Sequence, residues 1–503
     1  MSSKLMGIDV GTSSIKVGLL DEASGLIDFE QQGYNVETPH NGWVQIRADV
    51  LWSSLLACLA RMSQRHSFAD VVGIGFSCMS PGLVGFDAAG DVVVDPILYS
   101  DRRSDKEAAW LRREIGADHM FSITGNNVMA GAISVTSMLW VKRNAPDVYA
   151  RVRTFGHLNT LMGYRMTGKM ALDRCNASYT GLFDTVHTRD WSDELCRRAG
   201  VDRALLPAIL DSQDIVGRLN AAEVIGLGVP AGIPVVIGGA DSPCASLACG
   251  VIRAGDICQS VGTTNVLTIC IDKPVFSKAY LNRCHVIPGV WIYQGATSNG
   301  GLVVKWAREV FSKDLEEVGR ETGRNVFELM HEEAARSCAG ANGVVFLPYL
   351  AGERCPVWDA KAKGVFFGLH QENTREDMLR AVLESVCYST RQLLEIAEAT
   401  SGRTYDQIDT VGGGAKSRIW TQMKADILGR TMRMMELPEA AVVGAAMLAG
   451  MGAGIFSTAD EALALSRRTA AAVAPAATQE EKAVYEERYK TYTTLYDRLR
   501  DLF

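Results

Sequence analysis

Apolar residues in the first half of the chain fall into short runs separated by turn-forming residues. The runs at 5–10 and 15–20 flank Gly11-Thr12-Ser13-Ser14, which predicts a β-hairpin at the start of the chain. Beyond it, stretches with apolar residues at helical spacing alternate with apolar runs typical of buried strands. The helices expected in this half lie at 48–62, 110–115, 138–144, 151–166 and 244–249, and the strands at 71–76, 83–86, 92–94 and 234–239.

The second half shows the same alternation. Thr374 and Asp377 form a capping pattern that opens a long helix ending near residue 399. The alanine-rich stretch at 470–478 has low complexity, and we expect it to link the core to a terminal amphipathic helix. The other elements expected here are a hairpin around Val261, a strand at 408–411, and helices at 419–428 and 480–502. Alternating strands and helices predict an α/β fold in which helices cover the sheets.

The first hairpin recurs 251 residues later, close to the midpoint of the 503-residue chain. The matching pairs are Val10 and Val261, Gly11 and Gly262, Thr12 and Thr263, and Asp21 and Asp272. A chain of this length is too long for one hydrophobic core. We therefore predict two domains, 1–250 and 251–503, related by an internal duplication.

Composition narrows the classes of partner. A formal net charge of -7 disfavours nucleic acid or an anionic membrane as the main partner, so a small molecule is the expected ligand. The chain lacks a run of 18 apolar residues and an N-terminal signal-peptide pattern, so we expect a cytoplasmic protein. The 12 cysteines are scattered without a C-x-x-C pair, which predicts buried, reduced thiols rather than a zinc or disulfide framework.

The Gly-Thr turns are candidate phosphate sites. Each gathers backbone N–H groups and hydroxyls and lacks the Cβ that would block an anion, although a plain hairpin is the better explanation of one such turn taken alone. Two copies, together with Gly412-Gly413-Gly414 at a strand-to-helix junction, predict a nucleotide held between two similar domains. The segment 412–417 lacks the glycine that a Walker A motif requires before its lysine. The G-x-G-x-x-A match at 226–231 contains a proline and reads as a loop, which leaves an oxidoreductase without support.

Two carboxylates stand next to these turns or strands. Asp9 precedes the first turn, where it could hold Mg²⁺ directly or through water; the alternative is a cap of the hairpin. Asp241 follows the strand at 234–239, and the carboxyl end of a buried strand faces the crevice where α/β proteins bind ligands. The alternative for Asp241 is a helix N-cap.

Five blocks of sequence, in this order and spacing, resemble the FGGY family of carbohydrate kinases, which includes xylulose and glycerol kinases. The blocks are GIDVGTSSIKVGLLD (7–21), GGADSPCASLACG (238–250), SVGTTNVLT (260–268), GVFFGLHQENTREDMLRAVLES (364–385) and TVGGGAKSRIWTQMKADILG (410–429). The resemblance extends from Gly7 to about Gly450. It implies two ribonuclease-H-like domains of the actin, Hsp70 and hexokinase type, with ATP and sugar in the cleft between them.

The resemblance also implies roles for individual residues. Asp241 falls on the catalytic base, in an N-terminal domain that carries the sugar site, and Asp9 falls on the acid associated with Mg²⁺. Phosphoryl transfer needs mainly positioning and charge neutralisation, which this set supplies. The residues implied at the ATP site are Thr12, Ser13 and Lys16 beside the transferred phosphate, Gly262 and Thr263 in the second phosphate loop, Gly300 and Gly301 in a nucleotide-side turn, and Gly413 and Gly414 at the adenosine.

The substrate loops depart from the family pattern. Ser80-Pro81 replaces the Met-His pair of xylulose kinases, and the Arg-Glu pair of glycerol kinases is also absent. The loop Tyr99-Ser100-Asp101-Arg102-Arg103 resembles W-N-D-G-R with arginine for glycine, and Ser242 replaces the usual Asn or Gln. We expect Ser80, Pro81, Asp101, Arg103, Asp241 and Ser242 to contact the substrate, with a surface ion pair as the alternative for Asp101 and Arg103. The Glu353-Arg354 pair resembles a structural G-E-R motif at the domain interface.

These observations predict ATP-dependent phosphorylation of a hydroxyl of a small carbohydrate, a differently shaped or longer ketose, polyol or sugar acid. The alternative is a non-catalytic, nucleotide-dependent switch of the actin and Hsp70 kind. Asp241 separates the two, because only a kinase needs that carboxylate at a substrate. The sequence leaves the oligomeric state open, with a homodimer as one possibility.

Overall fold

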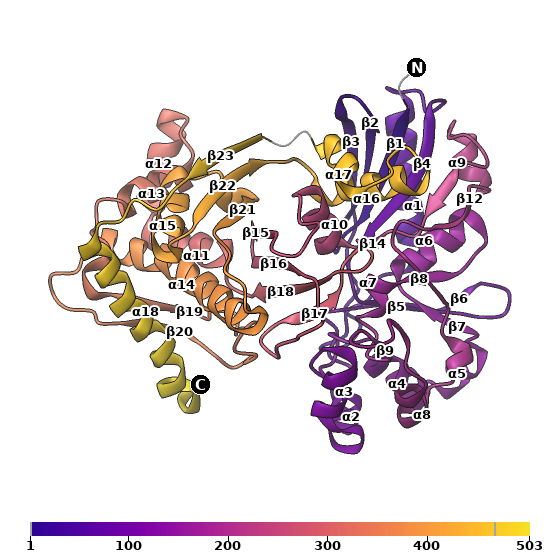
Figure 1. The fold of residues 1–503 in the computed structure, drawn as a ribbon, viewed down its shortest axis with the longest axis horizontal. Coiled ribbons are helices and arrows are strands. Elements are labelled where there is room, and N and C mark those ends of the chain that lie inside the picture. The colour runs from indigo at the N-terminus through magenta and orange to yellow at the C-terminus, as the bar shows by residue number, and fades with distance from the viewer. Residues whose placement is uncertain (1–2, 467–468) are drawn as a thin grey trace.

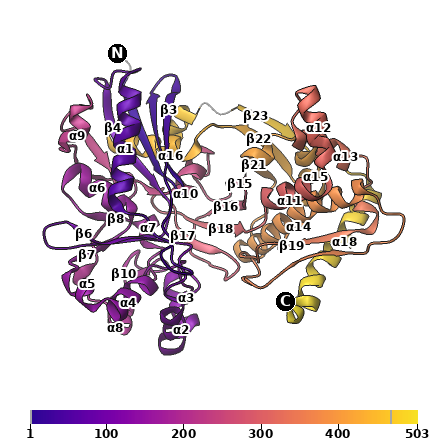
Figure 2. The same ribbon diagram turned by 180° about the vertical axis from the view of Figure 1, so that it is seen from behind.

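A seven-stranded sheet forms the centre of each of two lobes (Figures 1 and 2). The computed structural model describes residues 3–466 and 469–503. The N-terminal sheet has the order β12-β13-β4-β1-β2-β3, with β14 also paired to β4. Its strands are β1 Lys4–Val10, β2 Ser14–Asp21, β3 Gly25–Gly33, β4 Val71–Cys78, β12 Ile215–Arg218, β13 Pro234–Val236 and β14 Gly239–Ala240.

The C-terminal sheet has the order β17-β18-β16-β15-β21-β22-β23. Its strands are β15 Ile257–Val261, β16 Asn265–Ile271, β17 Leu281–Cys284, β18 Trp291–Thr297, β21 Gln407–Val411, β22 Thr431–Glu436 and β23 Thr469–Val473. In both sheets the first strand pairs antiparallel with the second and parallel with a later strand, β1 with β2 and β4, and β15 with β16 and β21. The predicted duplicated hairpin and the α/β fold class are confirmed.

Helices cover the faces of both sheets. In the N-terminal lobe α1 packs on β2 and β3, and α6 packs on β4 and β13. In the C-terminal lobe the long helix α14 packs on β16 and on helices α11, α13 and α15. The longer helices are α1 Ala48–Ser63, α4 Val135–Asn144, α6 Leu158–Thr167, α10 Asp241–Ala248, α11 Gly301–Phe311, α12 Lys313–Thr322, α13 Val326–Ala334, α14 Arg375–Ser401, α15 Arg418–Leu428, α16 Ala440–Gly452 and α18 Gln479–Leu499.

Smaller elements complete the lobes. A three-stranded sheet of the order β6-β5-β7 borders the N-terminal sheet, and β19 pairs with β20 in the C-terminal lobe. These strands are β5 Gly82–Phe86, β6 Val92–Leu98, β7 Thr154–Gly156, β19 Val345–Pro348 and β20 Gly364–Phe367. The shorter helices and strands are α2 Asp105–Leu111, α3 Ala117–Thr124, α5 Pro146–Arg151, α7 Arg174–Ala177, α8 Asp193–Ala199, α9 Ala222–Gly226, α17 Ala459–Ala462, β8 Ala171–Asp173, β9 Phe183–Asp184, β10 Asp190–Trp191 and β11 Ala208–Leu210.

Helix α16 lies on the N-terminal sheet although it comes late in the chain (Figure 1). Glycines make this approach possible: a Cβ added to Gly7 would lie 2.0 Å from the carbonyl oxygen of Val442, and one added to Gly75 would lie 2.2 Å from that of Ala445. On the other side, Gly444 lets α16 meet α10, since its Cβ would lie 1.9 Å from the carbonyl oxygen of Cys244. The division into domains at residue 250 stays a prediction. With that division, α16 belongs to the second domain by sequence but packs on the sheet of the first.

Several elements differ from those expected. The helix predicted at 151–166 is α5, then β7, then α6, because His157 and Thr160 form a new capping box that starts α6. The helix predicted at 110–115 is the end of α2 followed by a π-helical turn at Arg112–Gly116. Part of the alanine-rich stretch is the edge strand β23 rather than a linker, because backbone pairing with β22 does not depend on large side chains.

Two other expectations concern cysteines and membranes. All of the cysteines except Cys338 are buried, as predicted. Across the described residues, no helix combines the length and the apolar character needed to cross a membrane.

Candidate active site

The edge of the N-terminal sheet brings two carboxylates to one place. Strands β1 and β14 both run parallel to β4, and both Asp9 and Gly239 pair with Ser77 in the strand register. Asp241 follows two residues after Gly239 and begins helix α10. The hydroxyl of Ser77 donates a hydrogen bond of 2.7 Å to Oδ1 of Asp9. Because carboxyl ends of parallel strands share one edge, Asp9 and Asp241 face the same crevice.

Burial dominates the electrostatics of this pair. Removal from water raises the pKa of Asp9 to about 7; the hydrogen bond from Ser77 opposes this rise, and the charge of Asp241 adds to it. Burial also raises the pKa of Asp241, and the backbone N–H of Ser242 opposes that rise with a 2.7 Å hydrogen bond to Oδ1. Neither carboxylate has the capping role considered above: Asp9 is bound by Ser77 of another strand, and Ala240 is the N-cap of α10.

Lys16 lies near this edge, on β2 opposite Asp9 in the hairpin register. Its ammonium group is 2.6 Å from Oε2 of Glu439, the residue that precedes α16. The charge of Lys16 lowers the pKa of Asp9, whereas the charge of Glu439 raises it. Lys16 thus connects the first hairpin, Asp9 and the start of α16.

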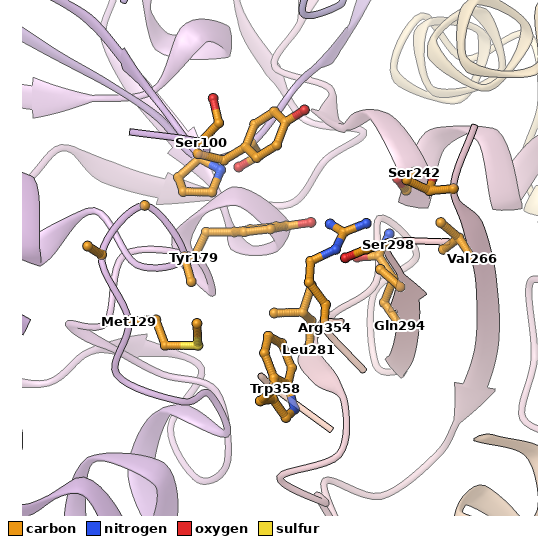
Figure 3. Close-up of a pocket in the computed structure, with 18 of the residues that line it drawn as sticks. Ser100, Met129, Tyr179, Ser242, Val266, Leu281, Gln294, Ser298, Arg354 and Trp358 are labelled. Atoms are coloured by element: carbon orange, nitrogen blue, oxygen red, sulfur yellow. The ribbon is translucent and has the colours of Figure 1, made fainter. Parts of the chain in front are cut away.

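Asp241 lines a cavity of about 520 Å³, here called the inter-lobe cavity. Figure 3 shows other residues of its lining, among them Tyr179 and Arg354. Both halves of the chain line it, and the hydroxyl of Thr12 in the first turn lies 3.4 Å from the hydroxyl of Tyr99 in its wall. The residues before 251 that line it are Ser80, Pro81, Tyr99, Ser100, Arg102, Met129, Ala130, Gly131, Ala132, Tyr179, Asp241 and Ser242. Those after 251 are Thr264, Val266, Leu281, Gln294, Ala296, Ser298, Ala351, Arg354 and Trp358.

The glycine turns of the C-terminal lobe meet at the end of β15. The N–H of Gly301 donates a 2.7 Å hydrogen bond to the carbonyl of Gly262, and that of Gly300 donates one of 3.1 Å to Thr263. A Cβ on Gly301 would lie 2.5 Å from the oxygen of Gly262, so the two turns can touch only without it. A Cβ on Gly414 would likewise lie 2.5 Å from Val261.

Two glycines of this cluster face open space instead. A Cβ on Gly262 or on Gly413 would meet nothing within 4 Å. Thr263 and Ser13, one in each Gly-Thr turn, are exposed. Both turns therefore leave backbone and hydroxyl groups accessible to a ligand.

The structure brings some predicted substrate residues to the inter-lobe cavity and not others. Ser80, Pro81, Asp241 and Ser242 line it. Asp101 and Arg103 do not. Asp101 is fully buried, and its Oδ2 accepts hydrogen bonds of 2.6 Å from the N–H of Val44 and 2.9 Å from Nε of Arg103.

The Asp101–Arg103 interaction is an ion pair, as the alternative reading of that loop had it, but it does not lie at the surface. The guanidinium of Arg103 stacks 4.1 Å from the ring centre of Trp43, and its side chain is only 4% exposed. The ion pair therefore exists, but it is buried rather than at the surface, and neither residue lines the inter-lobe cavity. The loop residues that face the cavity are its neighbours Tyr99, Ser100 and Arg102.

Sequence reasoning missed several lining residues. Tyr179, Gln294 and Met129 lie outside any motif, so no local signal marks them. Arg354, predicted to be structural, lines the cavity and points into it (Figure 3). The one available signal was Arg102, which stands where the family pattern has glycine.

Comparison with known proteins decides the family. The N-terminal and C-terminal domain models of the FGGY family of carbohydrate kinases match residues 4–248 and 258–453. The chain belongs to the FGGY family of carbohydrate kinases. It is 30% identical to the xylulose kinase of Lactococcus lactis over 90% of this chain and 89% of that one. It is 26% identical to the gluconokinase of Bacillus subtilis over 91% and 88%.

Solved structures of the FGGY family share the fold. The crystal structure of xylulose kinase from Rhodospirillum rubrum is 26% identical, covers 99% of each chain and superimposes with a TM-score of 0.90. The predicted actin- and hexokinase-like architecture is confirmed. As a member of this family the protein is a carbohydrate kinase that uses ATP, and the alternative of a non-catalytic switch has no support.

Proposed function

We propose that this kinase phosphorylates a small carbohydrate bound in the inter-lobe cavity, with Asp241 as general base. The observation that carries the proposal is that Asp241 is the only carboxylate among the described residues lining the cavity. Its carboxylate would accept the proton of a substrate hydroxyl as that oxygen bonds to the γ-phosphorus of ATP. The bond to the β-phosphate oxygen breaks in the same step, and ADP leaves. The raised pKa of Asp241 strengthens it as a proton acceptor.

The nucleotide would lie between the two Gly-Thr turns. Gly262 and Gly413 support this placement, because open space where a Cβ would stand lets phosphate or adenosine approach the backbone. Thr12, Ser13 and Lys16 would approach the transferred phosphate from the N-terminal lobe. The contacts from the C-terminal lobe would come from Gly262, Thr263, Gly300, Gly301, Gly413 and Gly414.

Asp9 fits a Mg²⁺ site. It is a carboxylate largely removed from water, close enough to Asp241 for the second charge to raise its pKa, and a cation would relieve both effects. Among the described residues no cluster of three or more His, Cys, Asp or Glu side chains could hold a metal by itself. This agrees with Mg²⁺, which commonly binds one or two carboxylates and completes its shell with water and phosphate. When bound, Mg²⁺ would neutralise charge on the phosphate oxygens.

Ser80, Pro81 and Ser242 would complete the carbohydrate site around Asp241. The hydroxyl of Ser242 lies 3.3 Å from Oδ1 of Asp241, so it can bind the base and the substrate at the same time. The buried hydroxyl of Ser80 has no hydrogen-bond partner in the described residues, which leaves it available to a sugar hydroxyl. A homodimer stays a prediction that light scattering would test.

The test is ADP release with Mg-ATP over a panel of ketoses, polyols and aldonic acids, for the wild type and Asp241→Asn. We expect the variant to lose about 10²- to 10⁴-fold in kcat while its affinity for ATP is unchanged. Asp105→Asn is the matched control, since Asp105 also begins a helix but does not line the cavity. The proposal would be contradicted if Asp241→Asn kept the wild-type kcat, or if no carbohydrate of the panel increased the rate of ADP release by the wild type.

A further inference from the structure

The inter-lobe cavity is rich in arginine and poor in carboxylate. Arg102 and Arg354 line it, and Asp241 is the only acid facing them among the described residues. Neither guanidinium has a carboxylate oxygen within 4.0 Å in the part of the chain that the structure describes. Two cations without ion-pair partners in a substrate cavity point to a ligand that supplies the negative charge.

Arg102 is held at the cavity wall by the backbone. Its Nη1 donates to three carbonyl oxygens, those of Ala130 at 2.7 Å, Asp101 at 3.2 Å and Tyr99 at 3.3 Å. All three bonds use the same nitrogen. The remaining donors of the fork, Nε and Nη2, bond to none of the described residues, and the side chain is exposed.

Arg354 reaches the cavity from the C-terminal lobe (Figure 3). Its only side-chain hydrogen bond within the described residues is a long one, 3.3 Å from Nη2 to the carbonyl of Thr297. The neighbouring carboxylate of Glu353 is occupied by other donors, the N–H groups of Ser298 at 2.5 Å and Arg354 at 2.8 Å and the amide of Asn299 at 3.3 Å. Glu353 therefore does not neutralise the guanidinium by a direct ion pair.

A third arginine stands behind the cavity wall. Arg283 is 1% exposed, and its guanidinium lies 3.5 Å from the ring centre of Tyr179, which lines the cavity. Its Nε and Nη1 have no hydrogen-bond partner among the described residues. A buried cation without partners is unfavourable unless negative charge lies nearby. Arg283 thus adds positive potential behind Tyr179 in the cavity wall.

We infer that the substrate is an anionic carbohydrate, whose oxyanion is bound by Arg354 and Arg102 while one of its hydroxyls faces Asp241. This inference rests on the proposed function and narrows it. The planar fork of a guanidinium matches both a carboxylate and a phosphate. The two sources of that chemistry are therefore a sugar acid and a sugar phosphate.

The deciding measurement is the ratio of kcat/KM for an anionic substrate to kcat/KM for its neutral counterpart of equal carbon number. Aldonates, sugar monophosphates, ketoses and polyols of four to six carbons form the panel. We expect aldonates or sugar phosphates to be the best substrates of the wild type, and the better of these two arms identifies the anion. Arg354→Gln and Arg102→Gln should each lower the ratio about 10- to 100-fold, with KM for ATP unchanged within about twofold. Arg354→Lys and Arg102→Lys should restore part of it.

The controls separate recognition from structure. Arg113→Gln removes an exposed arginine that does not line the cavity and should leave the ratio unchanged. A purely structural role for Arg102 would lower the rates of all substrates together and leave the ratio intact. In the wild type, higher salt should raise KM for the anion and not for the neutral sugar, a test that needs no variant.

Three results would overturn the inference: a neutral sugar preferred by the wild type, a ratio unaffected by both glutamine variants, or a rise in KM for ATP instead. In each of these cases the proposed kinase function stands as long as Asp241→Asn abolishes the sugar-dependent release of ADP. Failure of every carbohydrate to stimulate ADP release would instead overturn the proposed function itself.

Discussion

The two Gly-Thr hairpins have the same backbone but different chemistry. At an offset of 251 residues, Asp9 of the first hairpin corresponds to Ser260 of the second, and Lys16 corresponds to Leu267. The first turn therefore has a carboxylate and an ammonium group beside it. The second has neither, and is instead surrounded by the glycine backbone at 300–301 and 412–414.

This difference shows how the duplicated halves have specialised. The charged pair Asp9 and Lys16 lies at the first hairpin, in the N-terminal lobe, where the parallel edge of the sheet also presents Asp241. The C-terminal lobe instead offers a close approach to its main chain, which only glycine allows. In our proposal the first hairpin handles the reacting group and the cation, and the second holds the rest of the nucleotide.

The strongest test of this comparison substitutes, one at a time, the corresponding residues Asp9 and Ser260 of the two hairpins. Asp9→Asn should lower kcat about 10²- to 10³-fold, the range expected when a preorganised charge at the reaction centre is lost. Ser260→Ala, at the corresponding site of the second hairpin, should stay within about twofold of the wild type. Steady-state ADP release at saturating substrates measures both. Equal losses in the two variants would show that the hairpins have not specialised.

Replacing glycine by alanine tests whether the turns around the second hairpin need glycine. In Gly301→Ala the new Cβ would lie 2.5 Å from the backbone oxygen of Gly262, so the turns must separate. We expect a loss of stability of about 1–3 kcal/mol and a rise in KM for ATP of about tenfold or more. Gly413→Ala has open space, so thermal unfolding should match the wild type while KM for ATP rises. A Gly413→Ala enzyme with unchanged KM would remove that turn from the nucleotide site.

The pH dependence of stability tests the raised pKa of Asp9, the carboxylate of the first hairpin. Burial raises the pKa of Asp9 from 3.8, its value in the unfolded chain, to about 7 in the native state. Between these two pH values the carboxyl of Asp9 is protonated in the native state and ionised in the unfolded state. The contribution of Asp9 to the free energy of unfolding therefore falls as pH rises through that window and is constant above it. Without Mg²⁺ and nucleotide, Asp9→Asn should be more stable than the wild type at pH 8 and lose that advantage towards pH 4.

Thermal melts of both proteins between pH 4 and 8 measure this difference, and other titrating groups largely cancel in it. A stability difference independent of pH would show that Asp9 has an ordinary pKa. Mg-ATP should reduce the advantage of the variant at pH 8, because it binds only the native wild-type site tightly.

The smallest expected effects are the shifts in pH dependence that follow from removing the charge of Lys16 or of Glu439. The charge of Lys16 lowers the pKa of Asp9 and the charge of Glu439 raises it. Lys16→Met should therefore move the acid limb of kcat/KM to higher pH, and Glu439→Gln should move it to lower pH. Shifts of the same sign in the two variants would exclude this electrostatic link to Asp9.

Local sequence patterns predicted the features of the fold that are determined by residues close together in the sequence. The hairpins, the capping box at Thr374 and the position of Asp241 at a strand end follow from periodicity and turn chemistry, and the structure agrees. The lining by Tyr179 and Arg354 depends on contacts between distant segments, which no spacing encodes. The same holds for α16, which is apolar on all sides and so gives no indication of the lobe it joins.

The placement of α16 has a consequence for dividing the chain. A fragment ending near residue 250 would present the bare glycine faces of β1 and β4 to solvent, without the helix that normally fills them. Such a half should be insoluble alone and be rescued when 251–503 is produced with it. The second half of the sequence thus supplies a helix that completes the packing of the first lobe.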